Sequence, residues 1–153
     1  MLFKSLILVA VLSAFVRGHT EEEIKELEKK CQDKHSVGDD IFIKHEKEEL
    51  DSFEEFDITL KDDTVENHRC YVECLLSEFG LMKDGILELD ALVHLTEVEM
   101  NKRSITIDSA KLKADVVTCT AEVAEGHCMV SYHAVKCLYN WTKEHVDQKK
   151  AER

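Results

Sequence analysis

The sequence predicts a small all-α protein of about six helices, two of them short, held together by three disulfide bonds. It contains no proline, and the glycines beyond residue 18 are few and widely separated, so strong helix breakers are rare. Apolar residues recur at helical spacing, and no run of β-branched residues alternates with the period of a strand. The six cysteines form an even set, which is typical of a disulfide framework in an exported protein.

The N-terminal residues 1–18 have the order of a secretory signal peptide. Lys4 precedes the apolar run Leu6–Phe15, and Val16-Arg17-Gly18 ends the segment with small residues. This run is too short to span a bilayer, and no later stretch approaches the roughly 20 apolar residues that a membrane helix needs. We therefore expect a secreted, extracellular protein in which residues 19–153 form a single helical domain.

The charge of the chain argues against two classes of partner. The 32 acidic side chains outnumber the 20 basic ones, and the formal net charge is −12. Such a chain is repelled by nucleic acid and by anionic membranes, so we expect neither as a partner and no stable membrane insertion. The carboxylates are scattered along the sequence, which favours a role in solubility.

The first two predicted helices lie on either side of Gly38. Thr20 followed by Glu23 resembles a capping box, which predicts a helix from there to Cys31. Within residues 38–60, Asp39-Asp40 could cap a short helix that continues through residues 41–43. The acidic remainder of this segment has no clean period and is interpreted as a partly ordered insertion.

The third predicted helix has the clearest apolar stripe. Asp63 or Thr64 is expected to cap it, and Gly80 is expected to end it. The stripe consists of Val65, Val72, Leu75, Leu76 and Phe79.

Three more helices are predicted in the C-terminal half, each from its own stripe. The fourth begins near Asp90 and carries Leu89, Leu92, Val93, Leu95 and Val98. The fifth is capped by Asp108, ends at Gly126 and carries Ala110, Ala114, Val117, Ala121 and Ala124. The last carries Val130, Ala134, Cys137, Leu138 and Trp141.

The cysteine positions fit this helical plan. Cys70 and Cys74 are four residues apart in the third predicted helix, so their sulfurs share a face and can join that helix to two neighbours. Cys119 and Cys137 could cross-link the last two helices. Six cysteines allow 15 pairings, and these arguments do not select one. No metal site is expected, because neither paired C-x-x-C elements nor a finger-like Cys/His set is present.

The complete spacing resembles a known family, the six-cysteine odorant-binding and pheromone-binding proteins of insects. After Cys31 come 38 residues, of which Arg69 is the last, then Cys70-Tyr71-Val72-Glu73-Cys74, then 44 residues before Cys119, with eight-residue gaps before Cys128 and before Cys137. The segment Phe79-Gly80-Leu81-Met82 is also similar to the corresponding segment of that family, and the closest likeness is to ant pheromone-binding members. The first gap is longer than in many members.

This resemblance implies a fold and a function. The helices would surround an apolar cavity, and the protein would carry an odorant, a pheromone or another small hydrophobic ligand through aqueous fluid. The family's interlocked bonding implies three pairs: Cys31 with Cys74, Cys70 with Cys128, and Cys119 with Cys137. A chemoreceptor and a second copy of the chain are further conceivable partners, and no cofactor is implied.

The candidate ligand contacts are the inward apolar positions of the predicted helices. They are Val72, Leu75, Leu76, Phe79, Leu92, Leu95, Val117, Ala121, Ala134, Leu138 and Trp141. Tyrosine hydroxyls at positions 71, 132 or 139 could orient the ligand. The eight histidines, with His127 and His133 flanking Cys128, motivate the hypothesis that ligand release depends on pH.

Two rival functions and one modification site remain to be considered. An enzyme is disfavoured, because no nucleophile elbow, H-E-x-x-H motif or phosphate loop is present. A secreted helical factor that acts by protein–protein recognition would show the same stripes and cysteines, and it stays open as the alternative. Asn140-Trp141-Thr142 is a glycosylation sequon.

Overall fold

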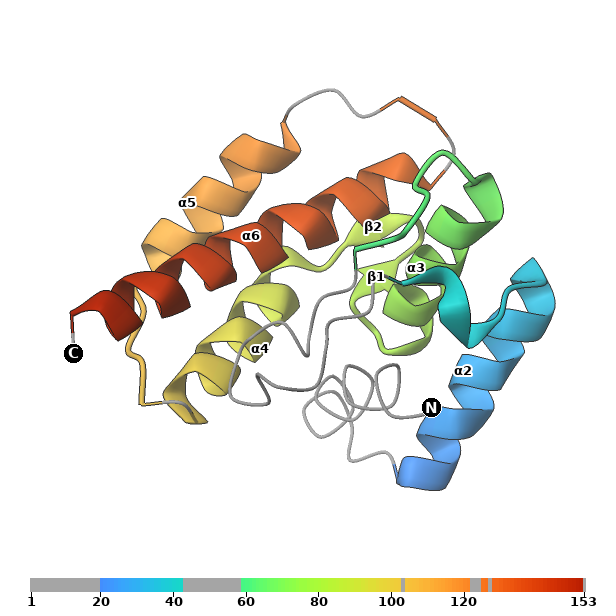
Figure 1. Cartoon of the computed structure of the whole chain (residues 1–153), viewed down its shortest axis with the longest axis horizontal. Coiled ribbons are helices and arrows are strands. Elements are labelled where there is room, and N and C mark those ends of the chain that lie inside the picture. The colour runs from blue at the N-terminus through green and yellow to red at the C-terminus, as the bar shows by residue number, and fades with distance from the viewer. Residues whose placement is uncertain (1–19, 43–58, 103, 122–124, 127, 153) are drawn as a thin grey trace.

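The computed structural model describes residues 20–42, 59–102, 104–121, 125–126 and 128–152. This part of the chain contains five α-helices, one 3₁₀ helix and one short β-hairpin (Figure 1). The predicted all-α class is confirmed, with five α-helices rather than six because the second predicted helix is a single 3₁₀ turn, Asp39–Ile41. The predicted signal peptide and most of the acidic segment lie outside the described residues.

Helix α2, Glu21–His35, begins with the predicted capping box. The Thr20 hydroxyl accepts a hydrogen bond from the Glu23 amide at 3.2 Å, and the Glu23 carboxylate accepts one from the Thr20 amide at 2.8 Å. These bonds satisfy two backbone donors that would otherwise lack partners at the helix start. The helix runs one turn beyond Cys31 and ends where Ser36 adopts a left-handed conformation with φ 53°.

The 3₁₀ helix that follows is not capped as predicted. Its N-cap is Gly38, which has no side chain to accept a hydrogen bond, and Asp39 lies inside the turn. The next residue, Phe42, pairs with Leu60 in an isolated antiparallel bridge, and the Lys61 amide donates to the Ile41 carbonyl oxygen at 2.9 Å. Two segments that are distant in the sequence therefore lie side by side.

Helix α3, Glu66–Glu78, also lacks the predicted cap. The Asp62 carboxylate accepts hydrogen bonds from the amide and the hydroxyl of Thr64, so the Thr64 side chain is engaged in a tight turn before the helix. These two bonds, the hydroxyl first, lower the pKa of Asp62 below its ordinary value of 3.8. The N-cap is Val65, without a side-chain hydrogen bond. Gly80, with φ 74°, ends the helix as predicted.

A hairpin that the sequence analysis did not predict follows α3. Strand β1, Met82–Lys83, pairs antiparallel with β2, Ile86–Leu87. Asp84 and Gly85 connect them with φ of 53° and 76°, the positive values at both central positions that a type I′ turn requires. The Asp-Gly dipeptide was the available signal, but two-residue strands are too short to show a period.

The last three helices are α4, Leu89–Lys102, α5, Ser109–Thr120, and α6, Met129–Ala151. Asp108 caps α5 as predicted, since its carboxylate accepts from the Lys111 amide at 3.1 Å. The prediction that α5 runs to Gly126 is wrong, because its C-cap is Ala121. Helix α3 packs against α2 and α6, and α5 packs against α6 and α4, so α3 and α6 form the centre of the fold (Figure 1).

The positive φ of the hairpin turn leads to a stability prediction. Replacing Gly85 by Ala should lower the free energy of unfolding by about 1 kcal/mol, because a side chain disfavours the left-handed conformation. A Cβ atom at this position would meet nothing within 4 Å, so the loss reports backbone strain alone. Urea denaturation measures it. Asp84→Asn is the control and should be near neutral, since Asn tolerates positive φ. An equal free energy of unfolding for G85A and the native chain would contradict the positive φ assigned to Gly85 in the turn.

Candidate ligand-binding core

Three disulfides fix the helices around α3. They join Cys31 to Cys74, Cys70 to Cys128 and Cys119 to Cys137, which are the pairs that the resemblance implied. The paired residues are 43, 58 and 18 positions apart, and in the loop-entropy model closing loops of these lengths stabilises the fold by about 3 to 4 kcal/mol each. The first bond attaches α3 to α2, and the second attaches α3 to the residue directly before α6.

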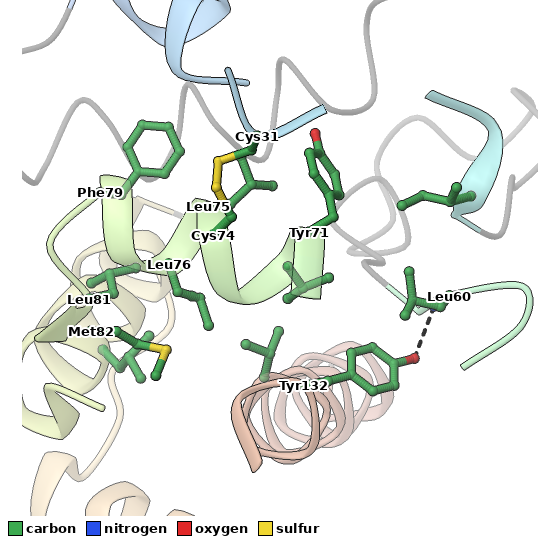
Figure 2. Close-up of a cluster of buried hydrophobic side chains, with 14 of the residues drawn as sticks. Cys31, Leu60, Tyr71, Cys74, Leu75, Leu76, Phe79, Leu81, Met82 and Tyr132 are labelled. Carbon is green, nitrogen blue, oxygen red and sulfur yellow. Dashed lines mark hydrogen bonds between the residues drawn. A yellow bond between two sulfur atoms is a disulfide. The ribbon is translucent and has the colours of Figure 1, made fainter. Parts of the chain in front are cut away.

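Helix α3 is buried around most of its circumference. Its buried positions are Arg69, Cys70, Tyr71, Val72, Cys74, Leu75 and Leu76. Because successive helical residues are about 100° apart, such a run leaves hardly any face for solvent. Apolar side chains from α2, the hairpin, α4 and α6 cover it and form one continuous cluster, part of which is drawn in Figure 2.

Six of the predicted ligand contacts meet in this cluster. They are Val72, Leu75, Leu76, Phe79, Leu92 and Leu95, all at most 7% exposed. Ala134 is also buried, and Leu138 is partly buried where it packs against two clusters. Trp141 lies in the second cluster, with Val93 of α4 and Leu112 and Val116 of α5.

The prediction of which face of α5 points into the core is wrong. Val117 is 47% exposed, and Ala121 is exposed as well, so neither can line the core. The buried face carries Leu112 and Val116 instead. Cys119 gave a usable signal, because it must face its partner in α6, and the residues three and seven positions earlier share its side of the helix.

Other core residues were not among the candidate ligand contacts, because most of them lie outside the stripes of the four longer C-terminal helices predicted. They are Ile24, Ile41, Leu60, Leu81, Met82 and Val135, together with Tyr71 and Tyr132, which had been considered only as hydroxyl donors. Both tyrosines are fully buried. Tyr71 and Tyr132 are the largest of the fully buried side chains in the described part of the chain, so their rings are as important to the packing of the core as their hydroxyls.

Polar atoms enter the cluster through the hydroxyls of two buried tyrosines. The Tyr132 hydroxyl accepts a hydrogen bond from the Leu60 amide at 3.0 Å, and this bond joins α6 to the bridge formed by residues 42 and 60 (Figure 2). The Tyr71 hydroxyl lies 3.5 Å from the carboxylate of Glu28, a buried acidic residue of α2. These groups give an otherwise apolar core hydrogen-bonding atoms in two places, beside Leu60 and beside α2.

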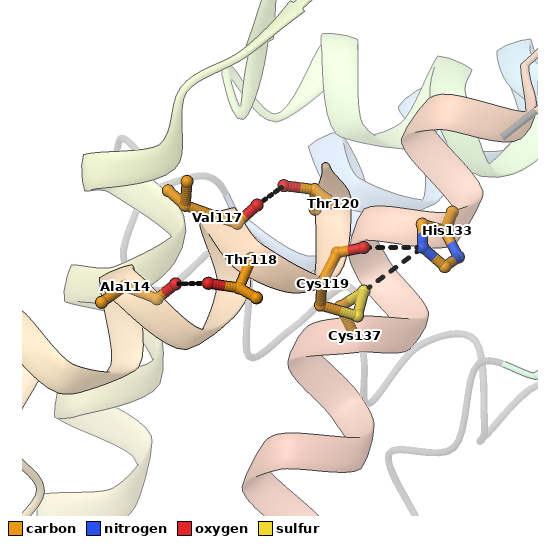
Figure 3. The surroundings of a disulfide bond; sticks show 7 residues. All are labelled: Ala114, Val117, Thr118, Cys119, Thr120, His133 and Cys137. Carbon is orange, nitrogen blue, oxygen red and sulfur yellow. Dashed lines mark hydrogen bonds between the residues drawn. A yellow bond between two sulfur atoms is a disulfide. The ribbon is translucent and has the colours of Figure 1, made fainter. Parts of the chain in front are cut away.

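A second polar cluster surrounds the Cys119–Cys137 disulfide (Figure 3). His133 Nε2 lies 3.0 Å from the Cys119 carbonyl oxygen and 3.7 Å from the Cys137 sulfur. The three ligand-type atoms lie within 4.8 Å of one another, as in a metal site. The two sulfurs are bonded to each other, however, so neither is the thiolate that a metal ion would need. We assign the cluster a structural role.

Asp115 connects α5 to α6 through Trp141. Its Oδ2 accepts a hydrogen bond from the indole Nε1 at 2.8 Å and forms an ion pair with Lys111 at 2.6 Å. The Lys111 bond, followed by the Trp141 bond, holds the pKa of Asp115 below its ordinary value of 3.8. The imidazole of His145 stacks on the indole with 3.6 Å between ring centroids. The Trp141 ring is thus held at its edge by the hydrogen bond to Asp115 and on its face by stacking on His145.

These features define a class: a small helical protein whose apolar core is assembled on one disulfide-anchored helix. None of the helices in the described part of the chain combines the length and the apolar character that crossing a bilayer requires. The model of the PBP/GOBP family matches residues 13–140, and the chain belongs to this family. Its members are secreted binding proteins for small hydrophobic ligands and are not enzymes. No curated protein and no solved structure matches the chain.

The Tyr132 hydrogen bond can be tested by removing its hydroxyl. Tyr132→Phe should lower the free energy of unfolding by about 1 to 3 kcal/mol, because it leaves the buried Leu60 amide without an acceptor. Amide hydrogen exchange at Leu60 should accelerate. The control Thr118→Val removes an exposed hydroxyl that donates to the Ala114 carbonyl oxygen, and it should change stability less. Unchanged exchange at Leu60 in Y132F would contradict the bond.

The Asp115 contact predicts a stability difference that depends on pH. A carboxyl whose pKa is lowered by folding stabilises the fold above its ordinary pKa, and this contribution is lost as the pH falls through its folded pKa. Asp115→Asn should therefore lower the melting temperature at pH 7 and have little effect below the folded pKa. Asp33→Asn, which breaks the exposed Lys29–Asp33 pair of α2, is the matched control, and it should lower the melting temperature at pH 7 by less. If D115N lowered the melting temperature by the same amount at pH 7 and at pH 2, the charge argument would be contradicted.

Proposed function

We propose that this protein is a secreted carrier that holds one small apolar ligand between α3, α4 and α6 and transports it through aqueous fluid. The observation that carries the proposal is the meeting of six predicted ligand contacts in one buried cluster of a PBP/GOBP family chain. Residues 1–18 would act as the signal peptide and residues 19–153 as the single binding domain. Odorants and pheromones are the ligand classes that the family supports, and the closeness to ant pheromone-binding members remains a prediction.

The proposed ligand contacts divide between two clusters. Those of the α3 cluster are Val72, Leu75, Leu76, Phe79, Leu92 and Leu95, with Ala134 and Leu138 contributed by α6. Trp141 belongs to the α5 side and would contact only a ligand long enough to pass Leu138. Val117 and Ala121 are removed from the proposal because they are exposed.

Apolar burial alone supplies enough free energy for such a carrier. A ligand of about ten methylene groups gains roughly 8 kcal/mol on burial, before the cost of association is subtracted. Micromolar affinity is therefore compatible with an uncharged ligand. A polar end group on the ligand would lie nearest the Tyr132 hydroxyl, which reaches the edge of the cluster at Leu60.

Binding partners other than the ligand are a separate part of the proposal. A carrier that delivers its ligand could dock to a chemoreceptor, and two copies of the chain could pair. The alternative function, a secreted factor that acts only through protein–protein recognition, predicts no affinity for small lipophiles, so ligand binding separates the two.

The binding experiment uses a fluorescent apolar probe, N-phenyl-1-naphthylamine, and a matched pair of variants. The native chain should bind the probe and release it when aliphatic alcohols or esters are added. Ala134→Phe places a ring in the buried surface of α6 and should weaken probe binding roughly tenfold, the equivalent of about 1.4 kcal/mol. Ala114→Phe makes the same change on the exposed face of α5 and should leave binding unchanged.

The same variants distinguish open space from close packing. If the surroundings of Ala134 are filled by protein, the added ring overpacks the core and lowers the free energy of unfolding by about 1 to 3 kcal/mol. If they accommodate the ligand, A134F keeps its stability and loses only the probe. Absence of probe binding to the native chain, together with tight binding to a protein partner, would overturn the carrier in favour of the recognition factor.

A further inference from the structure

The sequon at Asn140 lies in an unusual place for a glycosylation site. Such sites are normally found in surface loops, whereas residues 140–142 occupy the middle of α6, Met129–Ala151. The three residues also differ in accessibility. Asn140 is exposed, Trp141 is 9% exposed and Thr142 is 3% exposed. The folded chain therefore presents the residue that would carry the glycan and buries the two residues that follow it.

The buried residues of the sequon are held by specific contacts. The Thr142 hydroxyl donates to the Leu138 carbonyl oxygen at 2.7 Å, within the helix. The Trp141 indole donates to Asp115 of α5 and packs with Leu112 and Val116. Exposing Thr142 therefore requires α6 to unwind at its centre and Trp141 to leave the second cluster, which is more costly than fraying at a helix end.

The chemistry of glycosylation needs the group that the fold conceals. The Asn side-chain nitrogen forms a bond to the first sugar carbon of a lipid-linked oligosaccharide, the lipid pyrophosphate leaves from that carbon, and the amide nitrogen loses one proton. The hydroxyl two residues later is part of the recognised acceptor, which is why the sequon requires Ser or Thr. A helix whose Thr142 hydroxyl is buried and already donating cannot present that acceptor.

From this arrangement we infer that Asn140 is a glycosylation site only while α6 is unfolded, so that carbohydrate transfer and the folding of α6 compete. The Cys119–Cys137 bond reinforces the competition, because it links α6 to α5 three residues before the sequon. Once attached, a glycan is compatible with the folded protein, since the Asn140 side chain is exposed. Two folded forms, with and without glycan, are the expected result.

This inference rests on the proposed secretion, but it does not depend on the ligand, and it can be tested without a cell. The full chain is produced in bacteria, free of N-linked glycan, and is prepared in two states. One is oxidised and folded with all three disulfides, and the other is reduced and alkylated. Each state is incubated with a purified eukaryotic oligosaccharyltransferase and its lipid-linked oligosaccharide, and transfer is followed by intact mass.

The reduced chain should be glycosylated roughly tenfold faster than the folded chain, or more, because the folded site must first open. Asn140→Gln should remain unmodified in both states, which assigns the transfer to this residue. Thr142→Ser keeps the hydroxyl and should be modified when reduced. Equal rates for the two states of the native chain would overturn the inference, and so would the absence of transfer to the reduced chain.

Discussion

The attachment of α3 through two cysteines on one side of the helix is the constraint on which the rest of the structure depends. Cys74 ties it to α2 and Cys70 ties it to the start of α6. A helix buried around most of its circumference presents apolar side chains in several directions at once, so each neighbour that packs against it must contribute an apolar face. The position of the proposed ligand site follows, because within the part of the chain that the structure describes a ligand beside α3 would be enclosed by the segments that pack against it.

The starts of two helices could be predicted because they depend on hydrogen bonds between residues three apart. Thr20 with Glu23 and Asp108 with Lys111 are such pairs, and both form. The same reasoning failed before α3, where Thr64 had a nearer partner in Asp62. Capping residues compete with local turns for the same hydroxyl, and a sequence pattern does not state which interaction is stronger. The Asp84-Gly85 hairpin shows the opposite error, in which a specific turn signal was available but the strands beside it were too short to support it.

The candidate site was predictable where a helix has only one plausible apolar face, and α5 shows why the rest was not. Alanine is compatible with both core and surface, so a stripe of alanines has the right period without indicating which side is buried. In α5 the buried side is set by tertiary contacts, the disulfide of Cys119 and the packing of Val116 against Trp141. The residues contributed by the 3₁₀ helix and by Leu60 could not be predicted for a related reason. They reach the core through pairing between distant segments, and no local period records such pairing.

The two apolar clusters have different consequences for a carrier. The α5 side is closed by directed interactions, since the Trp141 indole is hydrogen-bonded to Asp115 and stacked on His145. Displacing that ring would cost both contacts, so the second cluster is better suited to hold α5 and α6 together than to admit a ligand. The α3 side is mostly aliphatic, and its hydrogen-bonded side chains include Tyr132, which contacts Leu60, and Tyr71, which contacts Glu28. Aliphatic side chains exchange one apolar neighbour for another at little cost in directed interactions, which makes this side the better place for a guest. In the proposed carrier, the disulfides that hold α3 would also keep the surrounding helices in place while a ligand enters and leaves the core.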